Sequence, residues 1–220
     1  MPEMLKLLLD AGTAVISDVF DSLGLRPTPL DTALFPVKGT GTRFAGPAYT
    51  IVGESREWAE GGDREKLAAI DAMSPGVVPV WAGTDIRGVC CFGDLLGSSM
   101  QARGCAGVVV DGGVRDLAYL RTLNMPVVAR FRTPAQGIHR WKVTAAQVPV
   151  QVRGAIDDWV TVAPGDTVVA DDDGVVIVPQ DIVNDVAGRV AEWSGTETVA
   201  RQEILRGMRL LDALEKFGHL

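Results

Sequence analysis

Three charged residues stand at a spacing that could support chemistry on a small anionic substrate. Asp94 is followed, after twenty intervening residues, by the adjacent pair Arg115 and Asp116. An apolar run at 108–110 separates them and is predicted to be a buried strand, so two loops at one sheet edge can bring the three together. A fixed cation beside a hard-oxygen metal ligand at a helix N-terminus suits binding of an oxo acid and stabilisation of an enolate.

The elements that must position these residues follow from hydrophobic periodicity and from the glycines. A helix is expected at 95–103 after the turn that holds Asp94, and a buried strand at 106–110. A glycine-rich loop at 111–114 is expected to open a second helix at 115–123. Both charged sites would then lie at helix starts, on neighbouring loops.

The rest of the chain alternates strands and helices, with strands clustered after residue 145. Residues 3–24 have helical spacing that Gly12 is expected to break, with Thr13 as the N-cap of the second part. A helix at 63–73 is expected to turn Leu67, Ala68 and Ile70 inward. Further strands are predicted at 45–52, 77–80, 126–130, 148–152, 159–162, 167–170 and 175–178, with a hairpin turn at 171–174, and further helices at 181–191 and 197–214. This pattern predicts an α/β fold with mixed sheets.

The spacing Asp-(20 residues)-Arg-Asp resembles the signature of the RraA-like class II pyruvate aldolases. That family includes 4-hydroxy-4-methyl-2-oxoglutarate/4-carboxy-4-hydroxy-2-oxoadipate aldolase and the regulator of ribonuclease E activity A. Four more segments, at 13–24, 45–50, 164–171 and 174–179, resemble the family's N-terminal helix and its core strands, in the same order. The resemblance implies a swivelling β/β/α sandwich, with residues 1–220 as a single RraA-like aldolase domain. It also implies a homotrimer or a dimer of trimers.

The resemblance also implies roles for the charged residues. Asp116 is expected to bind Mg²⁺ or Mn²⁺ directly, and Arg115 to bind the substrate and contact the developing enolate oxygen. Asp94 is expected to lie near the metal and help order its waters. On the residues alone, Asp116 could equally stabilise the helix dipole, Arg115 could form a surface ion pair and Asp94 could cap a helix.

The start of the helix after Asp94 is a candidate anion site. The backbone amides of Leu95, Leu96 and Gly97 are expected to bind the substrate carboxylate. Gly97 has no Cβ, which would allow the backbone to approach the ligand.

Two features depart from the family pattern or leave it open. The family often carries an acidic residue three positions after the metal-binding aspartate, and this chain has Tyr119 there. Some family members also receive an acidic side chain from the C-terminal region of a neighbouring subunit. Glu192 and Glu197 are both candidates for that role, and the sequence does not choose between them.

Composition excludes several classes of function. A net charge of −7 with scattered lysines and arginines disfavours a nucleic-acid surface. No apolar run approaches the length of a membrane helix, and no basic segment precedes an apolar run at the N-terminus, so we expect a cytoplasmic protein without membrane contact. Cys90, Cys91 and Cys105 have no metal spacing and are expected to be buried thiols. His139 and His219 are expected at the surface.

Two functions remain. None of the lysines, at positions 6, 38, 66, 142 and 216, falls in a predicted buried strand, which disfavours a Schiff-base aldolase. The first function is therefore a divalent-metal-dependent lyase that cleaves 4-hydroxy-2-oxo diacids to pyruvate and a second oxo acid and decarboxylates oxaloacetate. The alternative is a non-catalytic regulator that binds ribonuclease E. The apolar C-terminal segment, 197–220, is expected to contact a neighbouring subunit.

Overall fold

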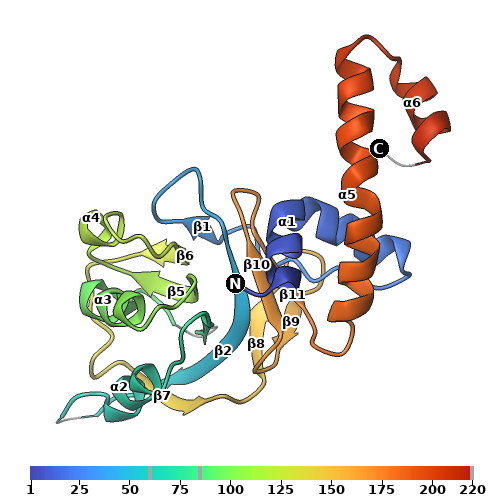
Figure 1. Cartoon of the computed structure of the whole chain (residues 1–220). Coiled ribbons are helices and arrows are strands. Elements are labelled where there is room, and N and C mark those ends of the chain that lie inside the picture. The colour runs from blue at the N-terminus through green and yellow to red at the C-terminus, as the bar shows by residue number, and fades with distance from the viewer. Residues whose placement is uncertain (59–60, 84–85, 219–220) are drawn as a thin grey trace.

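The computed structural model describes residues 1–58, 61–83 and 86–218, which form a mixed sheet with helices on its faces (Figure 1). The helices are α1 (Glu3–Ser22), α2 (Arg64–Asp71), α3 (Asp94–Ala102), α4 (Leu117–Leu120), α5 (Val183–Leu205) and α6 (Leu210–Phe217). The strands are β1 (Phe35–Pro36), β2 (Phe44–Ser55), β3 (Val78–Ala82), β4 (Cys90–Phe92), β5 (Val108–Val114), β6 (Val127–Arg132), β7 (Trp141–Ala146), β8 (Val150–Arg153), β9 (Trp159–Val162), β10 (Thr167–Ala170) and β11 (Val175–Val178).

The main sheet has the strand order β1-β6-β5-β3-β2-β10-β11 within the described residues. Strands β2, β3, β5 and β6 pair in parallel, whereas β10 joins β2 and β11 in antiparallel pairs. Two short strands extend it, because β4 pairs in parallel with the end of β5 and β7 pairs with the end of β2. Strands β8 and β9 form a separate hairpin. The predicted mixed α/β architecture is confirmed.

Three apolar clusters fill the interior. The first lies under α2 and α3 and contains Trp81, Trp141 and Phe92, all fully buried. A second is built from valines of the main sheet and of the β8–β9 hairpin. The third packs α1 and α5 against β10 and β11. Burying each such side chain contributes roughly 1.5–3 kcal/mol to the stability of the fold. The clusters therefore stabilise the strands whose ends hold the charged residues.

Helix α1 breaks at Gly12, as predicted. Gly12 has a φ of 87°, and a side chain there would lie 3.1 Å from a carboxylate oxygen of Asp171. The same carboxylate accepts hydrogen bonds from the amide and the hydroxyl of Thr13, both at 2.7 Å. The predicted hairpin turn between β10 and β11 is confirmed, and its Asp171 caps the second part of the helix. The expected N-cap role of Thr13 was wrong, because Thr13 donates to this carboxylate instead of accepting from the helix.

Two expected boundaries near the charged residues were wrong. Residues 111–114 belong to strand β5, not to a loop, and all four are buried. Gly113 is needed there because a Cβ would lie 2.5 Å from the carbonyl oxygen of Val89 and 2.6 Å from the ring of Phe131. The helix expected at 115–123 is the four-residue α4, which begins only after Asp116.

Other differences concern burial and helix ends. In α2, Leu67 and Ala68 are exposed, whereas Lys66, Ala69 and Ile70 are buried. The helices expected at 181–191 and 197–214 are instead α5, which runs through the predicted gap, and the separate α6. Strands β1 and β7 were not predicted.

The structure describes all three cysteines and one of the two histidines. All three cysteines are buried, as expected. His139 is half-buried with its ring centroid 5.2 Å from that of Trp58, so the expected surface position was wrong. His219 lies outside the described residues.

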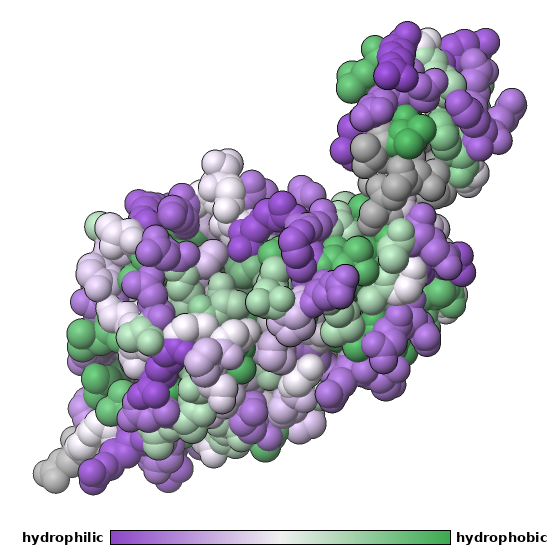
Figure 2. Space-filling model, in the orientation of Figure 1, coloured by the Kyte–Doolittle hydropathy of each residue, from purple (hydrophilic) through white to green (hydrophobic). Residues whose placement is uncertain are grey.

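The C-terminal part stands away from the rest of the molecule. The end of α5 and the whole of α6 project beyond the sheet and its helices (Figures 1 and 2). Leu205, Leu210, Leu211 and Leu214 are exposed on this projecting arm, which we call the C-terminal arm (residues 199–218). No helix among the described residues has the length and hydropathy to cross a membrane.

Candidate active site

The ends of β4 and β5 bring the predicted charged residues together. Cys90 pairs with Gly113 and Phe92 with Val114 in a parallel ladder, so both strands end at the same sheet edge. The Arg115 amide donates a hydrogen bond to the Phe92 carbonyl oxygen at 3.1 Å and fixes the two strand ends against each other.

Asp116 lies between the other two charged residues. One of its carboxylate oxygens is 3.3 Å from Nε of Arg115 and 3.4 Å from the backbone nitrogen of Asp94. A Cβ at Gly93 would lie only 2.7 Å from this oxygen, so the close approach requires glycine. The Asp116 side chain is 37% exposed and that of Arg115 is 40% exposed, which leaves both open to a ligand.

The backbone of Asp116 is held in a left-handed conformation, with φ 57° and ψ 36°. Its carbonyl oxygen accepts hydrogen bonds from the amides of Tyr119 and Leu120, at 2.9 and 3.0 Å, which hold this conformation. Aspartate tolerates left-handed geometry better than most residues, and such strain is concentrated at functional sites. The turn directs the carboxylate toward Gly93 and the start of α3.

The first turn of α3 was expected to bind an anion through the amides of Leu95, Leu96 and Gly97, and two of these amides already have acceptors within the chain. The Leu95 amide donates to a carboxylate oxygen of Asp94 at 2.7 Å, and the Gly97 amide donates to the Gly93 carbonyl at 3.0 Å within the helix. A Cβ at Gly97 would lie 2.9 Å from side chains of Leu120 and Leu123. Gly97 is therefore explained by the packing of α3 against α4 and not, as expected, by approach to a ligand.

Tyr119 links α4 to α3. Its hydroxyl lies 2.9 Å from the Ser98 hydroxyl, which in turn donates to the Asp94 carbonyl oxygen at 2.8 Å. The tyrosine is 46% exposed. This position supplies a neutral hydroxyl in place of a second carboxylate, so Asp116 and Asp94 are the acids next to Arg115 in the part of the chain that the structure describes.

A cleft of about 260 Å³ opens beside these residues. Arg115 and the turn at 93–96 line one side, β4 forms the floor, and the start of α2 with residues 136–138 lines the rest. Arg115 also borders a second depression of about 440 Å³, which Asp116 and Arg132 line with it. Burial raises the pKa of the Cys91 thiol in the floor to about 12, so it is not a nucleophile at neutral pH.

Two cations at the site were missed by the sequence reasoning. Arg132 ends β6, which neighbours β5, and pairs with Val114 in the register. Arg132 is the last residue of a third parallel strand that ends at this edge. A correct prediction of the strand order would therefore have placed Arg132 at the site. Lys66 lines the cleft from α2 and is 7% exposed. Its three-residue spacing from the capping Asp63 was the available signal.

The acids present fit a hard, mostly water-ligated cation. Among residues whose side chains the structure describes (1–58, 61–83, 86–193 and 199–218), no cluster of three or more His, Cys, Asp or Glu side chains could enclose a metal. Mg²⁺ commonly uses one or two protein carboxylates and keeps waters or substrate oxygens as its other ligands. Asp116, open to solvent and beside Asp94, matches that donor set.

Of the two C-terminal glutamates, the structure describes the side chain of Glu192, which is not part of this site within one chain. Glu192 lies on α5, pairs with Arg189 at 3.2 Å and is well separated from α3 and α4 (Figure 1). The side chain of Glu197 is outside the part that the structure describes.

The chain belongs to the RraA-like family, since the family model described as Aldolase/RraA matches residues 13–177. It is 36% identical over 150 residues to a Burkholderia multivorans protein named "Putative 4-hydroxy-4-methyl-2-oxoglutarate aldolase", covering 67% of this chain and 82% of that protein. It is 30% identical over 219 residues to protein DlpA of Legionella pneumophila, which covers 99% of this chain but 34% of DlpA, so the chain spans about a third of that relative.

The solved structures show the same fold. Streptomyces coelicolor RraAS2, described as an unusual member of the RNase ES inhibitor RraA protein family, matches with a TM-score of 0.76 and 28% identity. The match covers 91% of this chain and 96% of RraAS2. The family expectation from the sequence is confirmed, and the relatives named as aldolases indicate a lyase.

Proposed function

We propose that this protein is a divalent-metal-dependent lyase that cleaves 4-hydroxy-2-oxo diacids to pyruvate and a second oxo acid and decarboxylates oxaloacetate. The observation that carries the proposal is the meeting of Arg115, Asp116 and the start of α3 at one sheet edge. Arg115 thereby offers a cation to a small anion, and the start of α3 offers backbone donors to it. Asp116, next to both, offers an oxygen ligand for a metal ion.

Each residue has a distinct role in this proposal. Asp116 would hold Mg²⁺ or Mn²⁺, with Asp94 ordering the surrounding water, and the bound cation supplies Lewis acidity toward the 2-oxo group. Arg115 donates to the oxygen that becomes the enolate oxygen, because its planar fork remains charged throughout the reaction. The Leu96 amide in the first turn of α3 orients the adjacent carboxylate, whereas the amides of Leu95 and Gly97, which donate to Asp94 and Gly93, contribute through the helix dipole.

The two reactions share one enolate. In retro-aldol cleavage the 4-hydroxyl loses its proton, the C3–C4 bond breaks, and its electron pair becomes the C2–C3 double bond of pyruvate enolate. In oxaloacetate the same bond breaks with release of CO₂. A proton delivered to C3 from an ordered water completes pyruvate in both reactions.

The test follows pyruvate release from oxaloacetate with lactate dehydrogenase and NADH, after treatment with EDTA and after addition of Mg²⁺ or Mn²⁺. The proposal predicts turnover that metal restores in the wild type but not in Asp116→Ala. Asp181→Ala, at an exposed acid just before α5, serves as the matched control and should behave as wild type. A wild type with no metal-dependent pyruvate release would favour the ribonuclease E regulator instead.

We also propose that the protein assembles as a homotrimer or a dimer of trimers, with sites at subunit boundaries. The exposed leucines of the C-terminal arm support this, because such apolar surface is costly to leave in water. The part of α5 that leads into the arm carries Glu192 and Glu197, and a crossing arm would bring one of them to Asp116 of a neighbouring subunit. Deleting residues 195–220 should reduce assembly and activity together, and a fully active monomer of 23.4 kDa in light scattering would exclude the arrangement.

A further inference from the structure

Lys66 is a buried cation whose charge the proposed reaction does not use. It lies on α2, lines the same cleft as Arg115 and Asp94, and is 7% exposed. A lysine held out of water is costly unless a partner compensates its charge. The partners of its ammonium group therefore decide whether it is structural or available to a ligand.

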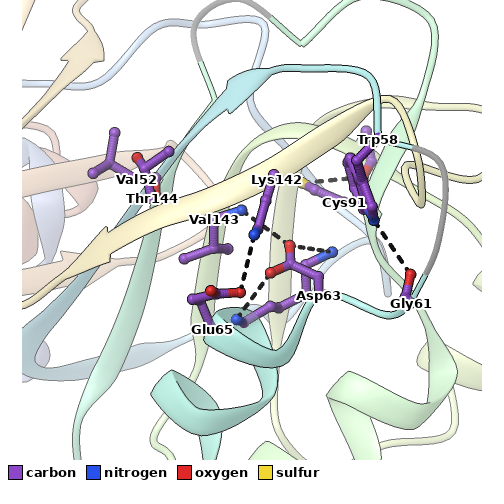
Figure 3. Close-up of polar contacts among 11 residues, drawn as sticks. Val52, Trp58, Gly61, Asp63, Glu65, Cys91, Lys142, Val143 and Thr144 are labelled. Atoms are coloured by element: carbon purple, nitrogen blue, oxygen red, sulfur yellow. Dashed lines mark hydrogen bonds and ion pairs between the residues drawn. The ribbon is translucent and has the colours of Figure 1, made fainter.

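The nearest acid to Lys66 is already engaged by the backbone. Asp63 caps α2 by accepting from the Lys66 amide at 3.1 Å, and its other oxygen accepts from the Val143 amide at 2.9 Å (Figure 3). The Lys66 ammonium is 3.6 Å from that second oxygen, beyond hydrogen-bond range. Asp63 thus balances the charge of Lys66 without satisfying its three hydrogen-bond donors.

The other acid near α2 has a different partner. Glu65 turns outward and pairs with Lys142 of β7 at 3.3 Å (Figure 3). The Lys66 ammonium nitrogen also lies over the buried ring of Trp141, 5.5 Å from its centroid. An aromatic face stabilises the cation and supplies no acceptor. Among the described residues, Asp63 and Trp141 are the partners of the Lys66 ammonium group and neither accepts a hydrogen bond from it, and Lys66 lines the cleft, where a ligand can supply an acceptor.

We infer that Lys66 binds the second carboxylate of a dicarboxylic 2-oxo acid, at the end of the cleft opposite the reacting group. This inference rests on the proposed function, in which Arg115 and the start of α3 take the 2-oxo acid end. The cleft then carries one cation for each end of the substrate, contributed by α2 and by the end of β5. Lys66 selects diacids over monoacids because only a diacid uses both.

Binding tests the inference without requiring turnover. 2-Oxoglutarate and 2-oxopentanoate differ only in the distal carboxylate, and calorimetry with Mg²⁺ present measures the affinity of each. The wild type should bind 2-oxoglutarate about 10- to 100-fold more tightly, the usual value of a hydrogen bond to a charged group. Lys66→Met should remove this preference, and Lys66→Arg should retain part of it.

Lys142→Met is the matched control, since it removes a lysine from the same corner outside the cleft. It should keep the wild-type preference. Circular dichroism and thermal unfolding show whether Lys66→Met is folded. If Lys66→Met is unfolded, Lys66→Arg decides the test, because it should retain part of the preference for 2-oxoglutarate. A wild type that binds both acids equally, or a folded Lys66→Met that still prefers 2-oxoglutarate, would overturn the inference.

Kinetics separate this inference from the proposed reaction. The ratio of kcat/KM for 4-hydroxy-4-methyl-2-oxoglutarate to that for 4-hydroxy-2-oxopentanoate should fall by about 10- to 100-fold in Lys66→Met. An equal loss for both substrates would assign Lys66 to the fold instead. If the wild type cleaves neither compound, the lyase proposal fails, and the binding preference alone decides the role of Lys66.

Discussion

The sheet carries two arginine–aspartate pairs in opposite settings. Arg115 and Asp116 meet at 3.3 Å beyond the end of β5, with both side chains more than a third exposed. Arg130 of β6 and Asp111 of β5 pair inside the molecule, where Asp111 is 1% exposed. Arg130 is also bound to Asp31 at 2.6 Å, and Asp111 accepts a hydrogen bond from the Arg153 amide at 3.5 Å.

The difference shows how position along one strand decides what a charge pair does. Arg130 is largely shielded from water, which would lower its pKa, but its hydrogen bonds to Asp31 and Asp111 prevail and keep the pKa above its ordinary value. The pair Arg130–Asp111 therefore has a structural role. The pair Arg115–Asp116 is longer and exposed to solvent, so its charges remain available to a substrate and a cation.

The largest expected effect is the loss of turnover in Asp116→Ala, by more than about 10³-fold, because the carboxylate expected to hold the metal is absent. Alanine is also strained at φ 57°, so Asp116→Asn, which tolerates that backbone, is the matched variant. Both should lose metal-dependent pyruvate release in the coupled assay and remain folded. Full activity of either with Mg²⁺ or Mn²⁺ would refute the assignment of Asp116.

The next effect is expected for Arg115→Lys. Lysine keeps the charge but loses the planar fork, and the enolate charge develops only in the transition state. We expect kcat to fall by about 10²–10³-fold with a much smaller change in KM. Steady-state kinetics with oxaloacetate measure both constants, and a variant whose sole defect is a higher KM would mean that Arg115 only binds substrate.

The buried pair should show the reverse pattern. Asp111→Ala leaves the Arg130 guanidinium without its closest partner and should lower the free energy of unfolding by about 3–5 kcal/mol. Urea denaturation measures this loss. Replacing both members, as Asp111→Leu with Arg130→Met, should recover part of it because no buried charge remains unpaired. A stability equal to wild type in Asp111→Ala would contradict the structural role.

The smallest effect concerns acid stability. Burial favours the neutral form of Asp31, but its hydrogen bonds to the Ala33 amide and to Arg130 prevail and lower its pKa below the ordinary 3.8. A depressed pKa stabilises the fold above the unfolded value, and this contribution is lost as the pH falls below about 4. Asp31→Asn should therefore be less stable than wild type by about 1 kcal/mol near pH 7. The difference should shrink toward pH 3 in thermal unfolding, and one that grows instead would reverse the assignment.

The meeting of Asp94 with Arg115 and Asp116 could be predicted because it depends on local signals. An apolar strand between two helix starts places both at one sheet edge, and the twenty-residue spacing is long enough for one helix and one strand. The left-handed turn at Asp116 and the short α4 could not be predicted. They depend on contacts with Gly93 and on packing against α3, which lie far apart from them in the sequence.

The errors elsewhere have the same origin. Leu67 was expected inside because its helical spacing is apolar, but α2 borders a cleft and turns Lys66 inward instead. Strand β7 was missed because its pairing partner, the far end of β2, is remote in the sequence. Helix α5 continues through residues 192–196, which lie between two helices expected from the sequence. Tertiary packing overrides local preference in each case.

The most direct measurement of the central claim is a crystal structure of the protein with pyruvate and Mg²⁺. The account predicts Mg²⁺ within about 2.0–2.1 Å of a carboxylate oxygen of Asp116, the distance usual for this ion. It also predicts the Arg115 guanidinium on the 2-oxo oxygen and the pyruvate carboxylate at the first turn of α3. Mg²⁺ bound away from Asp116, or Arg115 turned from a bound pyruvate, would contradict it.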